Sequence, residues 1–216
     1  MKKKKQHFFL LLLLFSFTIS CKGQDTSIET DLKACINEKV NNHNKESYGK
    51  EPFDFYEFII KIENELIHEK LLNDNKKDDY LALLKKISKS ENPKYEEIRK
   101  KLIKISDEYG FGFNLFTIND AIFNQCIYKV SKDVKEEEKL IYKLGTIFYE
   151  LTNKNYFDEE LIEELFKNIN ENIFKKDVYR APIILLVMID LDNQYNPDLK
   201  KYQEKQKGKS FLGQEE

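Results

Sequence analysis

Residues that favour tight turns or bends are scarce in this sequence. The 216 residues include only seven glycines and four prolines. Folds rich in β-hairpins need such residues at their turns, and phosphate-binding loops need closely spaced glycines. The shortage therefore disfavours a β-rich fold and leaves no glycine-rich loop for a nucleotide. Lysine, glutamate, leucine and isoleucine are abundant and favour helix. We predict an all-α, single-domain fold of about seven or eight helices.

Cationic side chains suited to nucleic acid are also scarce. Arg99 and Arg180 are the only arginines, and the formal net charge of the whole chain is −2. Losing the four lysines at 2–5 with a cleaved leader would change this charge from −2 to −6. Because nucleic-acid binding needs clustered cationic charge, we expect no nucleic-acid partner.

The first 20 residues have the organisation of a secretory leader. Lysines at 2–5 precede an apolar run at 8–20 that ends in small residues. A membrane-spanning helix needs about 20 apolar residues, and this run has about a dozen. We therefore expect residues 1–20 to be a signal peptide rather than a lasting transmembrane helix.

The end of this leader resembles a bacterial lipoprotein signal, because Ile19 and Ser20 precede Cys21. Thr18 stands where that pattern usually has leucine. In that family the cysteine is lipidated and becomes the first mature residue. The resemblance implies a multiply acylated Cys21, and two or more acyl chains anchor a protein stably to a membrane. The alternative is an ordinary secretory signal followed by an incidental cysteine.

By the same resemblance, the expected location is the bacterial cell envelope. Lys22 is not the residue that usually retains a lipoprotein at the inner membrane, which favours the outer membrane. Acidic residues after the cysteine sometimes accompany surface display, and only Asp25 is close. The leaflet and the face of the membrane stay open.

Hydrophobic periodicity predicts helices beyond the leader. We expect residues 21–27 to form a polar tether, residues 28–199 the helical domain and residues 200–216 a disordered tail. A polar loop is predicted at 41–52. Helical patterns cover 28–40, 54–72, 80–87, 93–109, 119–131, 140–151, 161–169 and 181–191.

Local signals mark the ends of some of these helices. Asn92 is a predicted N-cap with Pro93 at the first helical position, and Gly110 is predicted to end the same helix. Residues 181–191 are apolar on all sides but too few to span a bilayer, which predicts a fully buried helix.

Two cysteines remain beyond Cys21. Cys35 and Cys126 both lie on apolar stripes of predicted helices, in what should be an oxidising compartment. A disulfide between them and two separate core thiols are both compatible with this pattern. Two Cα atoms more than about 7 Å apart would exclude the bridge.

The chain has no recognisable catalytic or metal-binding motif. A Gly-x-Ser-x-Gly elbow is missing. Glu65 and His68 share a helix face, but di-iron bundles use two such pairs and the sequence has one. Residues 190–198 resemble a calcium loop without its glycine and final glutamate, so we predict instead a helix-ending turn before Pro197. We expect no catalytic residue, metal or cofactor.

The stretch at 109–116 has unusual chemistry. Tyr109, Phe111, Phe113 and Phe116 alternate around two glycines and could form a stacking surface for a sugar or a peptide. The alternative is a hydrophobic plug between two helices. We predict that Phe111 or Phe113 is exposed beside a groove.

These observations favour a non-catalytic, membrane-anchored binding protein of the bacterial envelope. Its expected partners are the membrane, through Cys21, and an envelope protein, peptide or glycan. An immunity or inhibitor protein acting against a toxin or hydrolase is a second hypothesis. A carboxylate-based hydrolase is the third, since paired carboxylates can perform hydrolysis; with 38 acidic residues a pair arises by chance, so the pattern neither supports nor excludes it.

Overall fold

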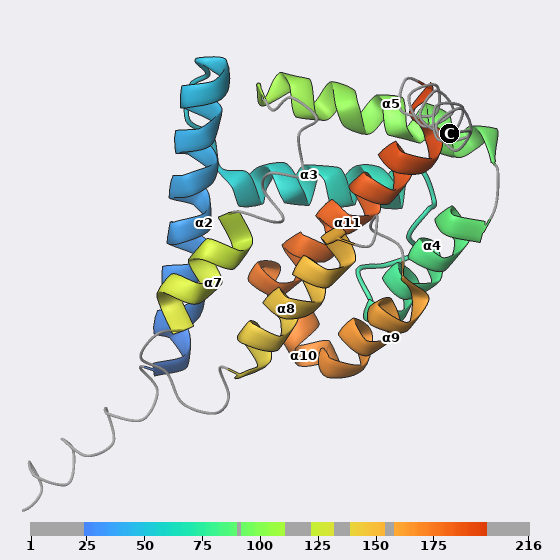
Figure 1. Cartoon of the computed structure of the whole chain (residues 1–216). Coiled ribbons are helices and arrows are strands. Elements are labelled where there is room, and N and C mark those ends of the chain that lie inside the picture. Colours follow the sequence, from blue (N-terminus) through green and yellow to red (C-terminus); the bar gives the residue numbers. More distant parts are fainter. Residues whose placement is uncertain (1–23, 90–91, 111–121, 132–138, 154–157, 198–216) are drawn as a thin grey trace, which may run out of the picture.

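The structure is a computed structural model that describes residues 24–89, 92–110, 122–131, 139–153 and 158–197 (Figure 1). Across these ranges nine helices and no strand are present, which confirms the predicted all-α fold. The helices are α2 (Gln24–Tyr48), α3 (Phe55–His68), α4 (Lys77–Lys89), α5 (Pro93–Glu108), α7 (Asn124–Ser131), α8 (Lys139–Asn153), α9 (Glu159–Asn168), α10 (Glu171–Phe174) and α11 (Asp177–Tyr195).

The C-terminal helix α11 crosses the middle of the molecule and organises the core (Figure 1). It packs against α2, α3, α4, α5 and α10. Every residue from Arg180 to Asp192 is buried, which confirms that residues 181–191 form a helix enclosed on all sides. In the described part of the chain, no helix combines the length and the apolarity needed to cross a membrane.

Several helices begin at polar side chains that cap the free N–H groups of the first turn. Asn92 accepts a hydrogen bond from the backbone N–H of Lys94 at 3.0 Å, and Pro93 follows it, as predicted. Asp54 and Asp158 cap α3 and α9 in the same way. Gly110, just after α5, has φ +69°, a conformation that glycine adopts readily.

Helix α2 is longer than predicted at both ends. It begins at Gln24, inside the stretch expected to be a tether, and continues to Tyr48, through most of the predicted loop at 41–52. Asn41 exchanges two hydrogen bonds of 2.8 Å with the backbone of Phe53, and Asn37 accepts one of 2.9 Å from the N–H of Phe55. The polar side chains that suggested a loop therefore hold the following turn against the helix.

Other helix boundaries also differ from the prediction. Helix α3 ends at His68 rather than at 72, and the short helix α10 was not predicted. Helix α11 ends at Tyr195 with Asn196 as its C-cap, which confirms the predicted end of a helix just before Pro197. Asp190 and Asp192 are buried in the last turns of this helix.

Candidate functional site

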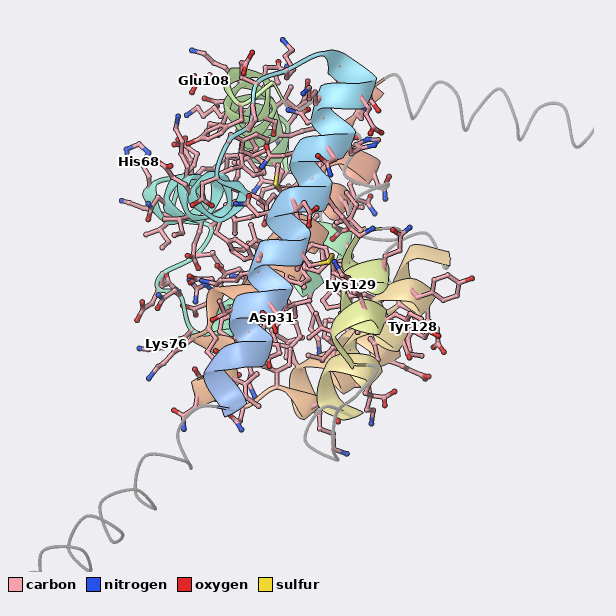
Figure 2. All side chains as sticks on the ribbon, turned by 90° about the vertical axis from the view of Figure 1, so that its left-hand side faces the viewer. Asp31, His68, Lys76, Glu108, Tyr128 and Lys129 are labelled. Carbon is pink, nitrogen blue, oxygen red and sulfur yellow. A yellow bond between two sulfur atoms is a disulfide. The ribbon has the colours of Figure 1, made fainter. Side chains whose placement is uncertain are left out.

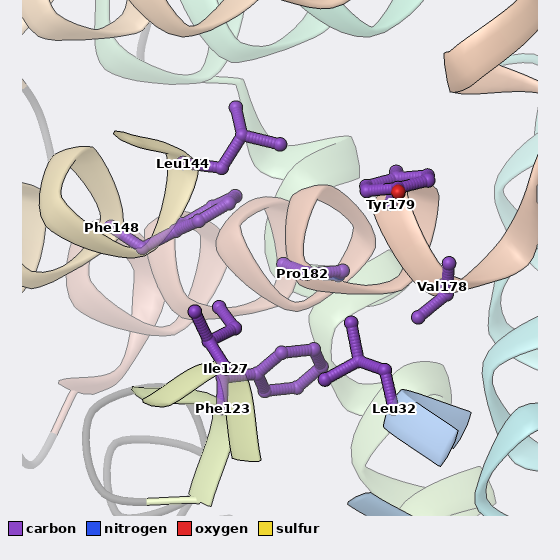
Figure 3. Close-up of a pocket in the computed structure, with 8 residues that line it drawn as sticks. All are labelled: Leu32, Phe123, Ile127, Leu144, Phe148, Val178, Tyr179 and Pro182. Atoms are coloured by element: carbon purple, nitrogen blue, oxygen red, sulfur yellow. The ribbon is translucent and has the colours of Figure 1, made fainter. Parts of the chain in front are cut away.

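An apolar pocket lies where α2, α7, α8 and α11 meet (Figure 3). Its cavity has a volume of about 20 Å³, enough for about one water molecule, and it is partly open to solvent. The only polar side-chain atom in its lining is the Tyr179 hydroxyl oxygen. The lining residues are Leu32, Phe123, Ile127, Leu144, Phe148, Val178, Tyr179 and Pro182.

Helical spacing brings these side chains to one place. Leu144 and Phe148 are four residues apart in α8 and therefore lie on one face of that helix. Val178 and Pro182 have the same spacing at the start of α11. The pocket is thus built from rigid helices, and it lies beside the first turns of α11.

A disulfide fixes one wall of the pocket. The structure joins Cys35 of α2 to Cys126 of α7, with their Cα atoms 5.7 Å apart. Cys35 follows the pocket residue Leu32 by three positions, and Cys126 precedes Ile127. Both cysteines are buried. The bridge therefore holds the two helices that supply Leu32 and Ile127 at a set separation.

The outer faces of the same helices expose aromatic side chains. Tyr128 projects away from α7 (Figure 2) and is 60% exposed. Tyr149 on α8 is 51% exposed. Each follows a pocket residue in the sequence, Ile127 or Phe148, and so points in a different direction from the pocket.

A buried charged cluster lies next to the pocket. The Nε atom of Arg180 is 2.8 Å from Oε1 of Glu63, and the Tyr80 hydroxyl donates a hydrogen bond to the same carboxylate. Arg180 also contacts Oδ1 of Asp177 at 2.9 Å, and Asp177 binds the amine of Lys33 at 3.0 Å. The cluster therefore links α3, α4, α11 and α2.

Burial keeps the tyrosines of this region neutral. Desolvation raises the pKa of Tyr80 far above its ordinary value, and the negative charge of Glu63 adds to the increase. The pKa of Tyr56 is raised mainly by desolvation and further by Asp177. Both phenols therefore keep their protons, and Tyr80 serves as a hydrogen-bond donor. The cluster joins helices, and Glu63 is not among the residues that line the apolar pocket.

A second buried ion pair joins α5 to α11. Nε and Nη2 of Arg99 each lie 2.6 Å from Oδ1 of Asp192, which also accepts a hydrogen bond from Asn196. Asp190, two residues earlier, is buried with no hydrogen-bond partner at Oδ2. Desolvation raises the pKa of Asp190 to about 7. Asp192 therefore stabilises the end of α11. Asp190 destabilises the core when it is ionised, because one of its carboxylate oxygens is buried without a hydrogen-bond partner.

Of the aromatic residues predicted from the sequence to form a binding surface, only Tyr109 lies in the described part of the chain. Tyr109 is half-buried, and its ring centroid lies 5.4 Å from those of both Phe53 and Phe58. It packs against the core rather than forming an open stacking surface. The rest of the proposed surface, Phe111, Phe113 and Phe116, and the lipidation candidate Cys21 lie outside the described residues.

One turn of α3 and the residue after it offer a cluster of possible metal ligands. Each of Glu65, His68 and Glu69 offers one possible ligand atom, and these three atoms lie within 4.8 Å of one another. The Glu69 carboxylate already binds Lys101 at 2.5 Å, and this hydrogen bond is the main reason that its pKa is lowered. A cation would have to displace Lys101, so the cluster is a poor candidate for a metal site.

The pocket was not predicted from the sequence. Its residues had all the features of ordinary core positions on apolar stripes, and they come from four helices that are distant along the chain. The signal that could have pointed to it is the position of Cys35 and Cys126 on those stripes. No family model, curated protein or solved structure matches the chain. Its function is therefore argued from its own residues.

Proposed function

We propose that this chain is a lipid-anchored, non-catalytic binding protein of the bacterial cell envelope, attached to the outer membrane through Cys21. The observation that carries the proposal is the leader, in which an apolar run too short to span a bilayer ends at Cys21. Lipid on Cys21 would attach the chain to a membrane, and no helix among the described residues is long and apolar enough to do so.

The apolar pocket supports a binding role. Small-molecule sites are usually concave, mostly apolar and largely formed before the ligand arrives. The pocket between α2, α7, α8 and α11 has such an apolar lining, and the Cys35–Cys126 bridge makes its wall rigid, but its cavity of about 20 Å³ admits only a very small group. Its lining contains no acid, base or nucleophile other than the Tyr179 hydroxyl, and this favours binding of an apolar group over a chemical reaction.

Metabolic labelling with a fatty-acid analogue tests the anchor. We expect the wild-type chain to incorporate label and to fractionate with membranes, whereas Cys21→Ser loses the label and remains unprocessed or is released. The double variant Cys35→Ser/Cys126→Ser is the matched control, because it changes two other cysteines and should keep the label. Equal labelling of the wild type and Cys21→Ser would refute lipidation at Cys21.

A further inference from the structure

Helix α7 is a small element at the edge of the fold (Figure 1). It has eight residues and packs mainly against α2 and α8. Phe123, just before α7, adds a contact with Phe55 of α3, with 6.2 Å between the ring centroids. The contacts that join α2, α3, α4, α5, α9, α10 and α11 to one another do not pass through α7. Detachment of α7 alone would therefore leave these contacts intact.

The sulfur atoms of the Cys35–Cys126 bridge are enclosed when α7 is in place. Cys35 is 4% exposed and Cys126 is fully buried. Disulfide exchange needs access, because the attacking thiolate must reach one sulfur of the bond that breaks. The same thiols in a folded, reduced chain would be buried in apolar surroundings, where thiols are inert. The bridge can therefore form only while α7 is away from α2.

The packing of α7 and the oxidation of the two thiols have different time scales. A helix forms within about a microsecond and folded units dock in milliseconds to minutes, whereas disulfide formation takes seconds to hours, depending on the oxidant. If α7 packs first, Cys35 and Cys126 are enclosed as thiols, and oxidation must wait until α7 detaches again. Prompt formation of the bridge therefore needs a fast oxidant that acts on the open chain.

We propose that this chain is the substrate of a dithiol oxidase of the bacterial envelope, which acts while α7 is detached, and that the new bridge then holds α7 against α2. The oxidase is defined by its chemistry, which is a reactive and strongly oxidising disulfide. Its location rests on the proposed function, because the leader is the feature that directs the chain to the envelope.

The exchange transfers two electrons from the chain to the oxidase. The thiolate of Cys35 or Cys126 attacks the oxidase disulfide, so that a mixed disulfide forms and one oxidase thiolate leaves. The thiolate of the other cysteine then attacks the chain's sulfur in the mixed disulfide. This second attack forms the Cys35–Cys126 bond and releases the second oxidase thiolate. The two protons of the chain's thiols end on the oxidase, which leaves as a dithiol.

A matched pair of variants tests whether α7 detaches by itself. Both are made in reduced Cys21→Ser protein, in which Cys35 and Cys126 are the only cysteines. Ile127→Ala removes packing from α7, and Ile98→Ala removes the same side chain from α5, which packs against α3 and α11. We expect Ile127→Ala to speed the reaction of the thiols with the small disulfide dithionitrobenzoate about tenfold or more, and Ile98→Ala to change it less than about twofold.

Two outcomes of this comparison would overturn the proposal. Equal or greater acceleration by Ile98→Ala would mean that the thiols are reached only when the whole domain unfolds. Loss of the helical circular-dichroism signal from the reduced Cys21→Ser protein would mean that the rest of the fold does not stand without the bridge. If the alanine variants fail to fold, Ile127→Val and Ile98→Val repeat the comparison, with an expected acceleration of roughly threefold at the first site only.

Expression of the full chain in a bacterial host with and without its periplasmic dithiol oxidase tests the partner. Thiols of the chain in the periplasmic and membrane fractions are alkylated after denaturation and counted by mass. We expect a bridged chain in the first host and free thiols at Cys35 and Cys126 in the second. Equal bridging in both hosts would refute the proposed partner. A labelled thiol at Cys21 in both hosts would instead count against the proposed anchor alone.

Discussion

Arg180 and Glu63 form an ion pair with 2.8 Å between Nε and Oε1, and both side chains are more than nine-tenths buried. The pair joins the central helix α11 to α3, and Tyr80 connects it to α4 through a hydrogen bond to Glu63. Taking two charges out of water is unfavourable unless each is fully paired. Arg180 also contacts Asp177 and donates a hydrogen bond to the carbonyl of Lys175, whereas its Nε lies close to Glu63 without hydrogen-bond geometry.

Removing one partner of this pair should destabilise the fold strongly. We expect Glu63→Gln to lower the free energy of unfolding by about 3 kcal/mol, because it leaves the Arg180 charge buried and only partly compensated. Urea denaturation followed by circular dichroism measures the change.

The control for this prediction is an exposed ion pair. Glu108 binds Lys61 at 2.8 Å, and both side chains are about half exposed. Glu108→Gln should change the stability little, because water screens exposed pairs. A loss from Glu63→Gln no larger than that from Glu108→Gln would show that the buried cluster does not hold α3 to α11.

Helices could be predicted from the sequence where neighbouring residues alone determine them. Asn92 and Pro93 act on the first turn of their own helix, and residues 181–191 are apolar except for Asp190. The continuation of α2 beyond residue 40 was not predictable in this way. It depends on a hydrogen bond that Asn41 donates to the carbonyl of Phe53 and one that Asn37 accepts from the N–H of Phe55, groups that approach only after the chain has turned back.

The pocket and the charged cluster depend still more on tertiary packing. Glu63 and Arg180 lie far apart in the sequence, and no local pattern indicates that they form an ion pair. Cys35 and Cys126 were recognised as possible partners because both lie on apolar stripes, but the alternative of separate thiols could be settled only by their placement. Contacts between helices distant in sequence form sites that periodicity does not encode.

Asp190 should make the stability of the fold depend on pH. Its pKa is raised from 3.8 to about 7, so between these values the folded chain holds a proton that the unfolded chain has lost. Raising the pH through this range therefore favours unfolding. The stabilisation is complete below about pH 4 and is lost by about pH 7, with a maximum of about 4 kcal/mol.

Asp190→Asn isolates this effect. The amide does not titrate, so the variant should gain stability relative to the wild type as the pH rises from 4 to about 8. Urea denaturation of both proteins at the two ends of this range measures the difference, and other titrating groups cancel in the comparison. A constant difference between wild type and variant at all pH values would contradict the assignment.

The disulfide should contribute much of the stability of the α2–α7 wall. A bridge between Cys35 and Cys126, which are 91 positions apart, removes conformational freedom from the unfolded chain. In the chain-entropy model we expect Cys35→Ser/Cys126→Ser to lower the free energy of unfolding by about 4 kcal/mol. Thermal and urea denaturation, with and without a reducing agent, measure the loss.

The control keeps the bridge. Cys21→Ser protein contains only Cys35 and Cys126, so it should show no reactive thiol after denaturation unless it is first reduced. Two reactive thiols in the unreduced, denatured protein would mean that the cysteines are separate. In that case the reducing agent should also leave the unfolding curve unchanged.

The aromatic stretch at 109–116 should divide into a structural part and an exposed part. The Tyr109 ring packs edge-on against Phe53 and Phe58, and the amine of Lys61 lies 5.3 Å from its centroid. Tyr109→Ala should therefore lower the free energy of unfolding by about 2 kcal/mol, less than the loss of a fully buried ring. Of Phe111→Ala and Phe113→Ala, the variant that removes the solvent-facing ring should leave the free energy of unfolding almost unchanged.

Hydroxyl-radical footprinting of the folded chain tests this division directly, because oxidation of a phenylalanine ring requires contact with solvent. We expect Phe111 or Phe113 to be oxidised much faster than Phe58, which is fully buried and serves as the internal control. A variant that removes the exposed ring should also weaken sedimentation of the protein with insoluble envelope glycan, at an unchanged melting temperature. Protection of Phe111, Phe113 and Phe116 to the level of Phe58 would instead identify the stretch as a hydrophobic plug. The apolar pocket would then remain as the candidate binding site of this chain.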